Sequence, residues 1–343
     1  MTLFTRSILA CAGVAVLGIA SAAAAQTAPD ASGLKVVDRI AGPDGGWDYA
    51  SFDVARRRVY VAHGMQVVAI DADSGAVNAA FASGNHLHAV TPVPGSDRLV
   101  TTNSGDNTAK IFNADTGALI ASVPTADDAD SALYDPASGL VLVVGGDSGQ
   151  IDFLDPKAAK VTASIKTGGK LEFLALDGRG KLFVNDENKH TIVVIDLATK
   201  TVTGAYDIPG CVSPTGLAYV TGDRLVSACG NGVAEILDAA SGRVIASLKI
   251  GARPDAVIYD AARGFAYIPS GGSGTLSVIA LSGPSANTVV DTVPTQAGAR
   301  TGTVDPKTGR IYLPAAEYLP PASPGQRPSI KPGSFRVLVL DRQ

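Results

Sequence analysis

One pattern recurs along the chain: a short run of mostly apolar residues, then an aspartate, then a turn that ends in glycine. The first copy covers residues 67–75 and reads Val-Val-Ala-Ile-Asp-Ala-Asp-Ser-Gly. The pattern returns six times with some variation, and its apolar runs end at Asn113, Asp155, Asp196, Asp238, Ala280 and Asp341. Starting from Asp71, the successive steps are 42, 42, 41, 42, 42 and 61 residues. A period this constant, broken once by an insertion, is typical of a radially repeated β architecture.

Each repeat reads as four short strands. In the fifth repeat they cover residues 216–220, 224–228, 233–237 and 243–250, and Gly, Asp and Ser occur in the turns between them, as a meander of strands requires. The chain ends directly after the seventh third strand, whereas residues 34–40 have the pattern of a fourth strand. We therefore predict an all-β fold, a seven-bladed β-propeller whose last blade is closed by the N-terminal strand.

Short motifs within the repeats carry a family resemblance. Residues 58–61 read Arg-Val-Tyr-Val, residues 45–49 Gly-Gly-Trp-Asp-Tyr, residues 105–108 Gly-Asp-Asn-Thr and residues 293–300 Val-Pro-Thr-Gln-Ala-Gly-Ala-Arg. With the Asp-x-x-Ser/Thr-Gly turns and the period near 42, they resemble the YVTN-repeat, YncE-like β-propeller family of exported bacterial proteins. The resemblance spans essentially the whole mature chain and implies a propeller and export, but propellers serve binding, scaffolding and catalysis alike. The sixth repeat departs from the pattern, because Ala280 replaces the turn aspartate.

Residues 1–25 have the features of a secretory signal: one cation, Arg6, then an apolar segment at residues 8–19 and a run of alanines that ends at Ala25. Such a segment is removed on export. We therefore expect cleavage near Ala25, a periplasmic or secreted protein, and a single propeller domain over residues 26–343.

The charge balance narrows the range of partners. The formal net charge is −4 and no run rich in lysine and arginine occurs, so neither a nucleic-acid groove nor an anionic membrane surface is favoured. After the signal segment, no stretch is long and apolar enough to span a membrane. We expect a monomer whose partner is a small molecule or a protein.

One residue per blade is predicted to face the central channel. In a propeller the first strand of each blade lines the channel, and the residue just before it points to the axis at one mouth. Aligning the repeats puts seven polar residues there: Asp48, His88, Asp130, Glu172, Thr215, Asp255 and Arg300. Carboxylates and an imidazole on one axis could hold a divalent cation such as calcium or zinc, and the candidate ligands are Asp48, His88, Asp130 and Glu172. Arg300 could hold an anionic group, and Asp48, Asp130, Thr215, Asp255, Arg300 and the neighbouring Trp47 are candidate ligand-binding residues.

Three classes of function stay open for this ring. The first is a module that binds a small ligand or a protein at the channel mouth. The second is a metal-assisted hydrolase, lactonase, lyase or isomerase, in which a cation polarises a carbonyl or activates water and His88 or Glu172 acts as general base; some propeller lactonases use calcium held by carboxylates at the channel mouth. The third is a cell-envelope scaffold, because a channel mouth also carries polar residues for solvation alone.

Three further features are predicted on the same face. Residues 314–332 contain six prolines, explain the longest step, and could form a lid, a docking arm or a stiff insertion. Cys211 and Cys229, the two cysteines of the mature chain, flank two strands of the fifth repeat, so we expect them to form a disulfide after export. His63 ends a second strand near Asp48 and could join the ring or serve packing.

Overall fold

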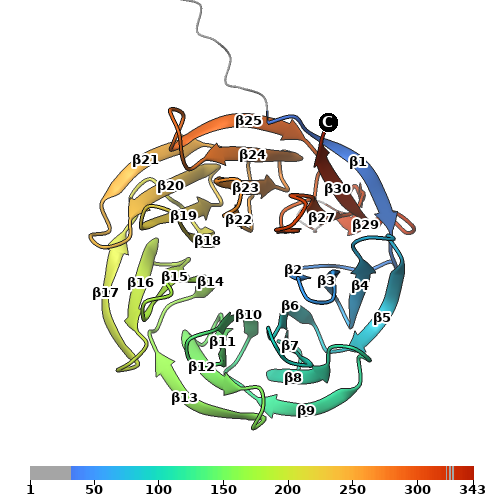
Figure 1. Cartoon of the computed structure of the whole chain (residues 1–343), viewed down its shortest axis with the longest axis horizontal. Helices are drawn as coiled ribbons and strands as arrows, with labels where there is room; N and C mark the ends of the chain where they lie inside the picture. The colour runs from blue at the N-terminus through green and yellow to red at the C-terminus, as the bar shows by residue number, and fades with distance from the viewer. Residues whose placement is uncertain (1–31, 322, 324–325, 327) are drawn as a thin grey trace, which may run out of the picture.

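The computed structural model describes residues 32–321, 323, 326 and 328–343, so the predicted signal segment lies outside the described residues. In these residues, seven four-stranded antiparallel sheets stand like blades around one axis (Figure 1). This arrangement confirms the predicted seven-bladed β-propeller. Over the described ranges there is no helix long and apolar enough to cross a membrane.

In blades 1 to 6 the strands follow the chain from the axis to the rim (Figure 1). Blades 1 to 3 contain β2 (Ala50–Asp53), β3 (Arg58–His63), β4 (Gln66–Asp71), β5 (Val77–Ser83), β6 (Leu87–Pro92), β7 (Arg98–Asn103), β8 (Thr108–Asn113), β9 (Leu119–Pro124), β10 (Ala129–Asp135), β11 (Leu140–Gly145), β12 (Gln150–Asp155) and β13 (Lys160–Lys166). Blades 4 to 6 contain β14 (Leu171–Leu176), β15 (Lys181–Asp186), β16 (Thr191–Asp196), β17 (Thr201–Asp207), β18 (Pro214–Val220), β19 (Arg224–Cys229), β20 (Val233–Asp238), β21 (Val244–Lys249), β22 (Ile258–Asp260), β23 (Phe265–Ser270), β24 (Thr275–Ala280) and β25 (Thr288–Pro294).

Blade 7 is built from both ends of the described chain. Its strands are β26 (Thr303–Val304), β27 (Ile311–Ala315), β30 (Arg336–Arg342) and β1 (Leu34–Ala41). Strand β1 pairs with β30, from Leu34 opposite Arg342 to Ala41 opposite Arg336, and is the outermost strand of the blade (Figure 1). The N-terminal strand therefore closes the ring as predicted, and it covers an edge that β30 would otherwise expose.

The core lies between blades rather than inside one central mass. Buried apolar side chains form seven clusters, each centred on the boundary between two neighbouring blades. In one of them, Val226 and Ile236 of blade 5 pack with Ile268 and Ile279 of blade 6. Each fully buried side chain of this kind contributes about 1.5–3 kcal/mol to folding. This packing explains why the middle strands read as near-continuous apolar runs, because both of their faces are covered.

The recurring turn aspartate has a local structural role. The Asp71 carboxylate accepts hydrogen bonds from the Ser74 backbone N–H and hydroxyl, both at 2.7 Å. Gly75 has φ +74°, and its N–H donates to the Asp71 carbonyl at 2.8 Å. In blade 6 Ala280 cannot cap a turn in this way, and a longer loop closes with the Asn287 N–H on the Ala280 carbonyl at 2.7 Å. The exception in the sequence pattern is thus a local change of turn within an intact blade.

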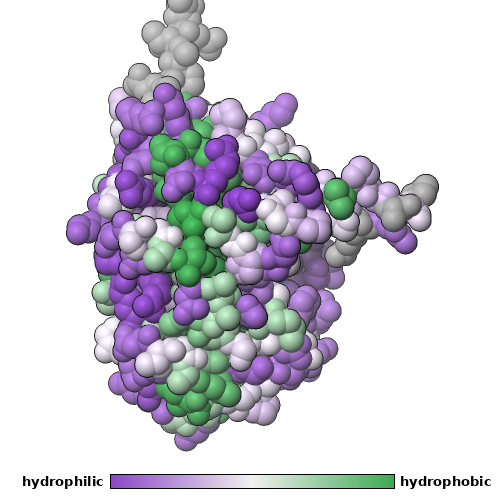
Figure 2. All heavy atoms as spheres, turned by 90° about the vertical axis from the view of Figure 1, so that its right-hand side faces the viewer, coloured by the Kyte–Doolittle hydropathy of each residue, from purple (hydrophilic) through white to green (hydrophobic). Residues whose placement is uncertain are grey.

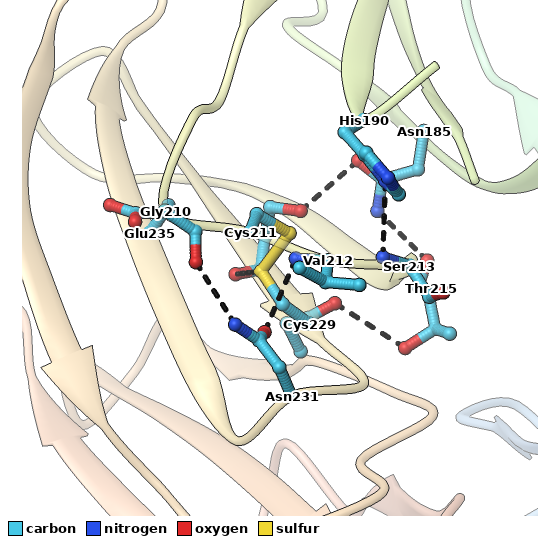
Figure 3. Close-up of a disulfide and its surroundings, with 12 residues drawn as sticks. Asn185, His190, Gly210, Cys211, Val212, Ser213, Thr215, Cys229, Asn231 and Glu235 are labelled. Carbon is cyan, nitrogen blue, oxygen red and sulfur yellow. Dashed lines mark hydrogen bonds between the residues drawn. A yellow bond between two sulfur atoms is a disulfide. The ribbon is translucent and has the colours of Figure 1, made fainter. Parts of the chain in front are cut away.

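A disulfide joins Cys211, in the loop before β18, to Cys229 at the end of β19 (Figure 3). Around it, the Asn231 side chain donates to the Gly210 carbonyl at 3.1 Å and accepts from the Val212 N–H at 3.2 Å. The predicted pairing is confirmed, and it ties the loop that enters blade 5 to the body of that blade.

The predicted insertion in blade 7 contains a small hairpin. Strand β28 (Tyr318–Leu319) pairs with β29 (Ser329–Ile330), between β27 and β30. With the disc seen edge-on, this segment projects from one face, and a band of hydrophobic side chains runs along the rim (Figure 2). The hairpin connects a second strand to a third strand, so it lies on the face where the first strands begin.

Candidate functional site

The seven predicted axial residues occupy equivalent positions, and a hydrogen bond to a backbone carbonyl crosses every blade boundary around them. From blade 1 to blade 4, the Tyr49 N–H donates to the carbonyl of His88 (3.0 Å), the Thr102 hydroxyl to that of Asp130, the Ser131 hydroxyl to that of Glu172 (2.7 Å) and the Asn185 side-chain amide to that of Thr215 (2.9 Å). From blade 5 to blade 7, the Thr215 hydroxyl donates to the carbonyl of Pro254 (3.0 Å), the Asp255 N–H to that of Arg300 (3.2 Å) and the Thr301 hydroxyl to that of Asp48 (2.7 Å). These bonds tie each blade to the next where the axial side chains begin.

Three of the axial side chains meet in one cluster. His88 Nδ1 lies 2.7 Å from Asp48 Oδ2 and 3.4 Å from Asp130 Oδ1. One donor atom from each residue lies within 4.8 Å of the other two. The second ring nitrogen, His88 Nε2, is 2.9 Å from the Ser104 hydroxyl. Two carboxylates and an imidazole at this spacing form a donor set that divalent cations use.

Burial and proximity shift the protonation of this cluster. Burial lowers the pKa of His88, but the hydrogen bond with Asp48 and the charge of Asp130 outweigh it, so the pKa is raised. Burial, followed by the charge of Asp48, raises the pKa of Asp130 to about 8. Without a bound cation, the cluster therefore retains protons at neutral pH.

Glu172, the fourth predicted metal ligand, lies outside this group of three. Its Oε1 is 3.7 Å from Lys170 Nζ, which is also 2.5 Å from Glu187 Oε2. Burial and the charge of Asp130 raise the pKa of Glu172 to about 10. This carboxyl group is therefore protonated at neutral pH.

Arg300 is engaged by protein groups. Its Nε donates to Asp255 Oδ2 at 2.8 Å, and its Nη2 donates to the Trp47 carbonyl at 2.9 Å and lies 3.6 Å from Asp48 Oδ1. The guanidinium also lies over the Trp47 ring, 5.8 Å from the centroid. We expected Arg300 to hold an anionic ligand, whereas in the structure it offsets two carboxylates of the ring.

The remaining candidates contact packing partners. His63 is 4% exposed, and its ring packs edge-on against Phe335 with centroids 4.5 Å apart. Trp47 is 5% exposed and contacts the Phe335 and Tyr318 rings at 5.6 and 6.2 Å. The Thr215 hydroxyl is used in the boundary bond described above. The contacts of His63 and Trp47 belong to the wall between blades 7 and 1, and the hairpin side chain Tyr318 reaches this wall.

Two aromatic rings that the sequence analysis missed meet beneath the axial ring. Tyr49 and Phe173 directly follow Asp48 and Glu172, and their rings lie 5.0 Å apart. They come from β2 and β14 and their flanks, on opposite sides of the axis (Figure 1). The other blades have small residues at the same step: Ala89, Ser131, Gly216, Ala256 and Thr301. Extending the repeat alignment by one residue would have revealed this aromatic pair.

Comparisons with known proteins support the fold and say little about activity. A model of a family of unknown function, DUF7283, matches residues 7–144. No curated protein matches the chain. Among solved structures, a chain of the Kuenenia stuttgartiensis hydrazine synthase is similar, with 15% identity and a TM-score of 0.70 over 78% of this chain and 92% of that chain. A chain of a mitotic checkpoint complex is also similar, with 14% identity and a TM-score of 0.71 over 91% of this chain and 96% of that chain. At these identities the likeness shows the propeller fold alone, and the narrower YVTN-repeat resemblance stays a prediction.

Proposed function

We propose that this protein is a binding module that holds a divalent metal cation at the axial ring, with Asp48, His88 and Asp130 as ligands. The observation that carries the proposal is their geometry, because three donor atoms from three different blades converge within 4.8 Å. In a tetrahedral site with bonds of about 2.0–2.2 Å to zinc, neighbouring donor atoms are themselves about 3.3–3.6 Å apart. The separation of 3.4 Å between His88 and Asp130 matches that spacing, whereas the separation of 2.7 Å between His88 and Asp48 is that of a hydrogen bond and has to widen when a metal ion binds.

The donor set favours zinc or manganese over calcium. Calcium takes six to eight oxygen ligands, whereas an imidazole nitrogen suits transition metals. Ser104 supports His88 from behind: when the Nε2–H donates to its hydroxyl, Nδ1 is left with a lone pair toward the two carboxylates. Three protein ligands also leave coordination positions for an oxygen donor of a small ligand that enters from the mouth.

The charges around the cluster favour a cation over an anion. Four carboxyl groups face the axis, and the one axial arginine is shared by Asp255 and Asp48. Among the described residues, no lysine or arginine lies within 4.0 Å of Asp130, whose ion-pair partner is His88. A divalent cation would supply the positive charge that this part of the ring lacks.

The test is metal content and thermal stability of the purified protein, with and without a chelator. We expect about one metal ion per chain and a lower melting temperature after chelation, since a ligand that binds only the folded state stabilises it. Asp130→Asn should abolish both effects. Asp147→Asn, an exposed residue in the same blade, makes the same charge change and should keep them. If the purified protein contains no metal, takes up no zinc or manganese and has the same melting temperature with and without chelator, the cation site is refuted. A scaffold would then be the better account.

A second candidate is an enzyme at the same mouth, favoured by the protonated Glu172. A carboxyl group held neutral at pH 7 can donate a proton to a leaving group, while a metal ion beside it polarises a carbonyl. Glu172→Gln keeps the shape and the neutral charge of the side chain but removes the acidic proton that could be transferred to a leaving group. We expect it to retain cation binding and stability and to lose any metal-dependent turnover of aryl esters or lactones. Absence of turnover in the wild-type protein across such a panel would rule against these reactions.

A further inference from the structure

A cavity of about 490 Å³ lies in the channel beneath the Tyr49–Phe173 pair. It extends along the first strands to Pro94 and Pro136, which lie in turns between first and second strands. Those turns are on the face opposite to the axial ring, so the cavity opens away from the proposed cation site. The two aromatic rings form the boundary between the two regions.

The wall of the cavity is apolar and rich in aromatic rings. Tyr49, Phe173, Tyr134 and Tyr259 all line it, together with aliphatic side chains such as Leu133. Of the described residues that line it, none carries a charge. Burial of a flat, apolar surface against such a wall is favourable, because aromatic rings pack well against one another in offset or edge-to-face arrangements.

Two of the polar groups of the wall are used within the protein, and those that remain are hydroxyls without charge. The Thr91 hydroxyl donates to the Ala132 carbonyl at 3.2 Å, and the Tyr259 hydroxyl accepts from the Thr221 N–H at 3.1 Å. A charged ligand would therefore lose its hydration without finding a compensating partner. This argues for a neutral occupant.

The space exists in part because two blades carry alanine at the step where blades 1 and 4 carry Tyr49 and Phe173. Ala89 and Ala256 line the cavity from blades 2 and 6. Its volume is within the range of about 300–1,000 Å³ of small-molecule pockets, and an apolar cavity of roughly 150 Å³ already accepts benzene. A molecule with two or three rings therefore fits this space.

We propose that this cavity is a second binding site, which takes up a neutral aromatic molecule of two or three rings from the face opposite to the axial ring. Such a site works independently of the cation. Its occupant touches the far side of the aromatic pair and no residue of the Asp48–His88–Asp130 cluster.

The experiment uses N-phenyl-1-naphthylamine, a neutral probe whose fluorescence rises in apolar surroundings. Titrated with the purified protein, it should show a saturable rise with one site per chain, and naphthalene should displace it. Thr303→Trp, which places a large ring in the cavity wall, should weaken binding at least tenfold. Thr201→Trp makes the same change on the exposed outer strand β17 and should leave it within twofold.

Two further variants keep the result decisive. If Thr303→Trp lowers the melting temperature strongly, Thr303→Leu replaces it in the titration. This smaller side chain should still weaken binding of the probe severalfold. Asp130→Asn should bind the probe as the wild type does, whatever happens to the cation. A wild-type protein that gives no saturable rise, or a rise that both Thr303 variants retain in full, would overturn the proposal and leave a channel that holds water only.

Discussion

The two halves of the channel are built from neighbouring positions along the first strands of the blades, yet they differ in almost every physical property. Above the Tyr49–Phe173 pair lie four carboxyl groups, a histidine and an arginine, and burial raises the pKa of two of the carboxyl groups, Asp130 and Glu172. Below it, an uncharged wall encloses about 490 Å³. The backbone repeat fixes where each side chain starts, and the residue type at each step then decides the chemistry. A change in one half should therefore leave the other half intact, except at the two aromatic rings that they share.

The largest effect is expected from Tyr49→Ala, because it removes the shared boundary. Tyr49 is 7% exposed and packs on Phe173, and truncating a buried aromatic residue costs about 3–5 kcal/mol. We expect a loss of that order in urea unfolding and weaker binding of both the cation and the naphthylamine probe. Unchanged affinity for both would show that the Tyr49–Phe173 pair is not the boundary between the cation site and the apolar cavity.

A change of pH should alter binding of the cation at the axial ring and leave binding of the probe in the apolar cavity unchanged. A metal ion must displace protons from Asp130, whose pKa is about 8, and from His88, whose pKa is raised. Each displaced proton makes the affinity rise about tenfold per pH unit, so cation affinity should rise about ten- to a hundredfold per pH unit between pH 6 and 8 and level off above, as for other proton-linked metal sites. The probe should bind equally at all these pH values.

The stability of the metal-free protein should move in the opposite direction. The folded pKa of Asp130 lies above its unfolded value of 3.8, so folding favours the protonated carboxyl. That stabilisation is complete below pH 4 and is lost as pH rises through about 8. Chelated protein should thus melt at a lower temperature at pH 9 than at pH 6, and Asp130→Asn should reduce the difference. A melting temperature that rises over this range would contradict the assignment.

Ser104→Ala tests the support behind His88. Losing a hydrogen-bond partner of a metal-bound histidine typically costs about 10- to 100-fold in affinity, and we expect the lower end because Ser104 is partly exposed. Ser148→Ala, the same substitution in the turn between β11 and β12 of the next blade, should leave titrations with zinc unchanged. Equal affinity in both variants would mean that His88 needs no such support.

The smallest effect is expected from Arg300→Gln. Whether zinc affinity rises or falls in this variant shows what the guanidinium does at the site. Removing the guanidinium takes away a positive charge that lies 3.6 Å from Asp48, so zinc affinity should rise severalfold. Leaving Asp255 without its partner should also lower the melting temperature. A fall in zinc affinity would indicate that Arg300 positions the Asp48 carboxylate for the metal ion instead of competing with it.

The repeat pattern predicted the blades and the closing strand because these follow directly from the period. It could not predict which partner each side chain takes in a neighbouring blade. Arg300 turns to Asp255 and His63 to Phe335, and such choices depend on neighbours that lie far away in sequence. The lower cavity could not be predicted for a related reason, because residues from six blades form its wall and no single motif marks it.

The most direct test of the cation site is a calorimetric titration of chelator-treated protein with zinc chloride at pH 8. We predict one ion per chain for the wild type and for Asp147→Asn, and a loss of about 100-fold in affinity for Asp130→Asn, because a charged ligand is removed. Equal binding by wild type and Asp130→Asn, or no binding by the wild type, would contradict a cation site at the axial ring.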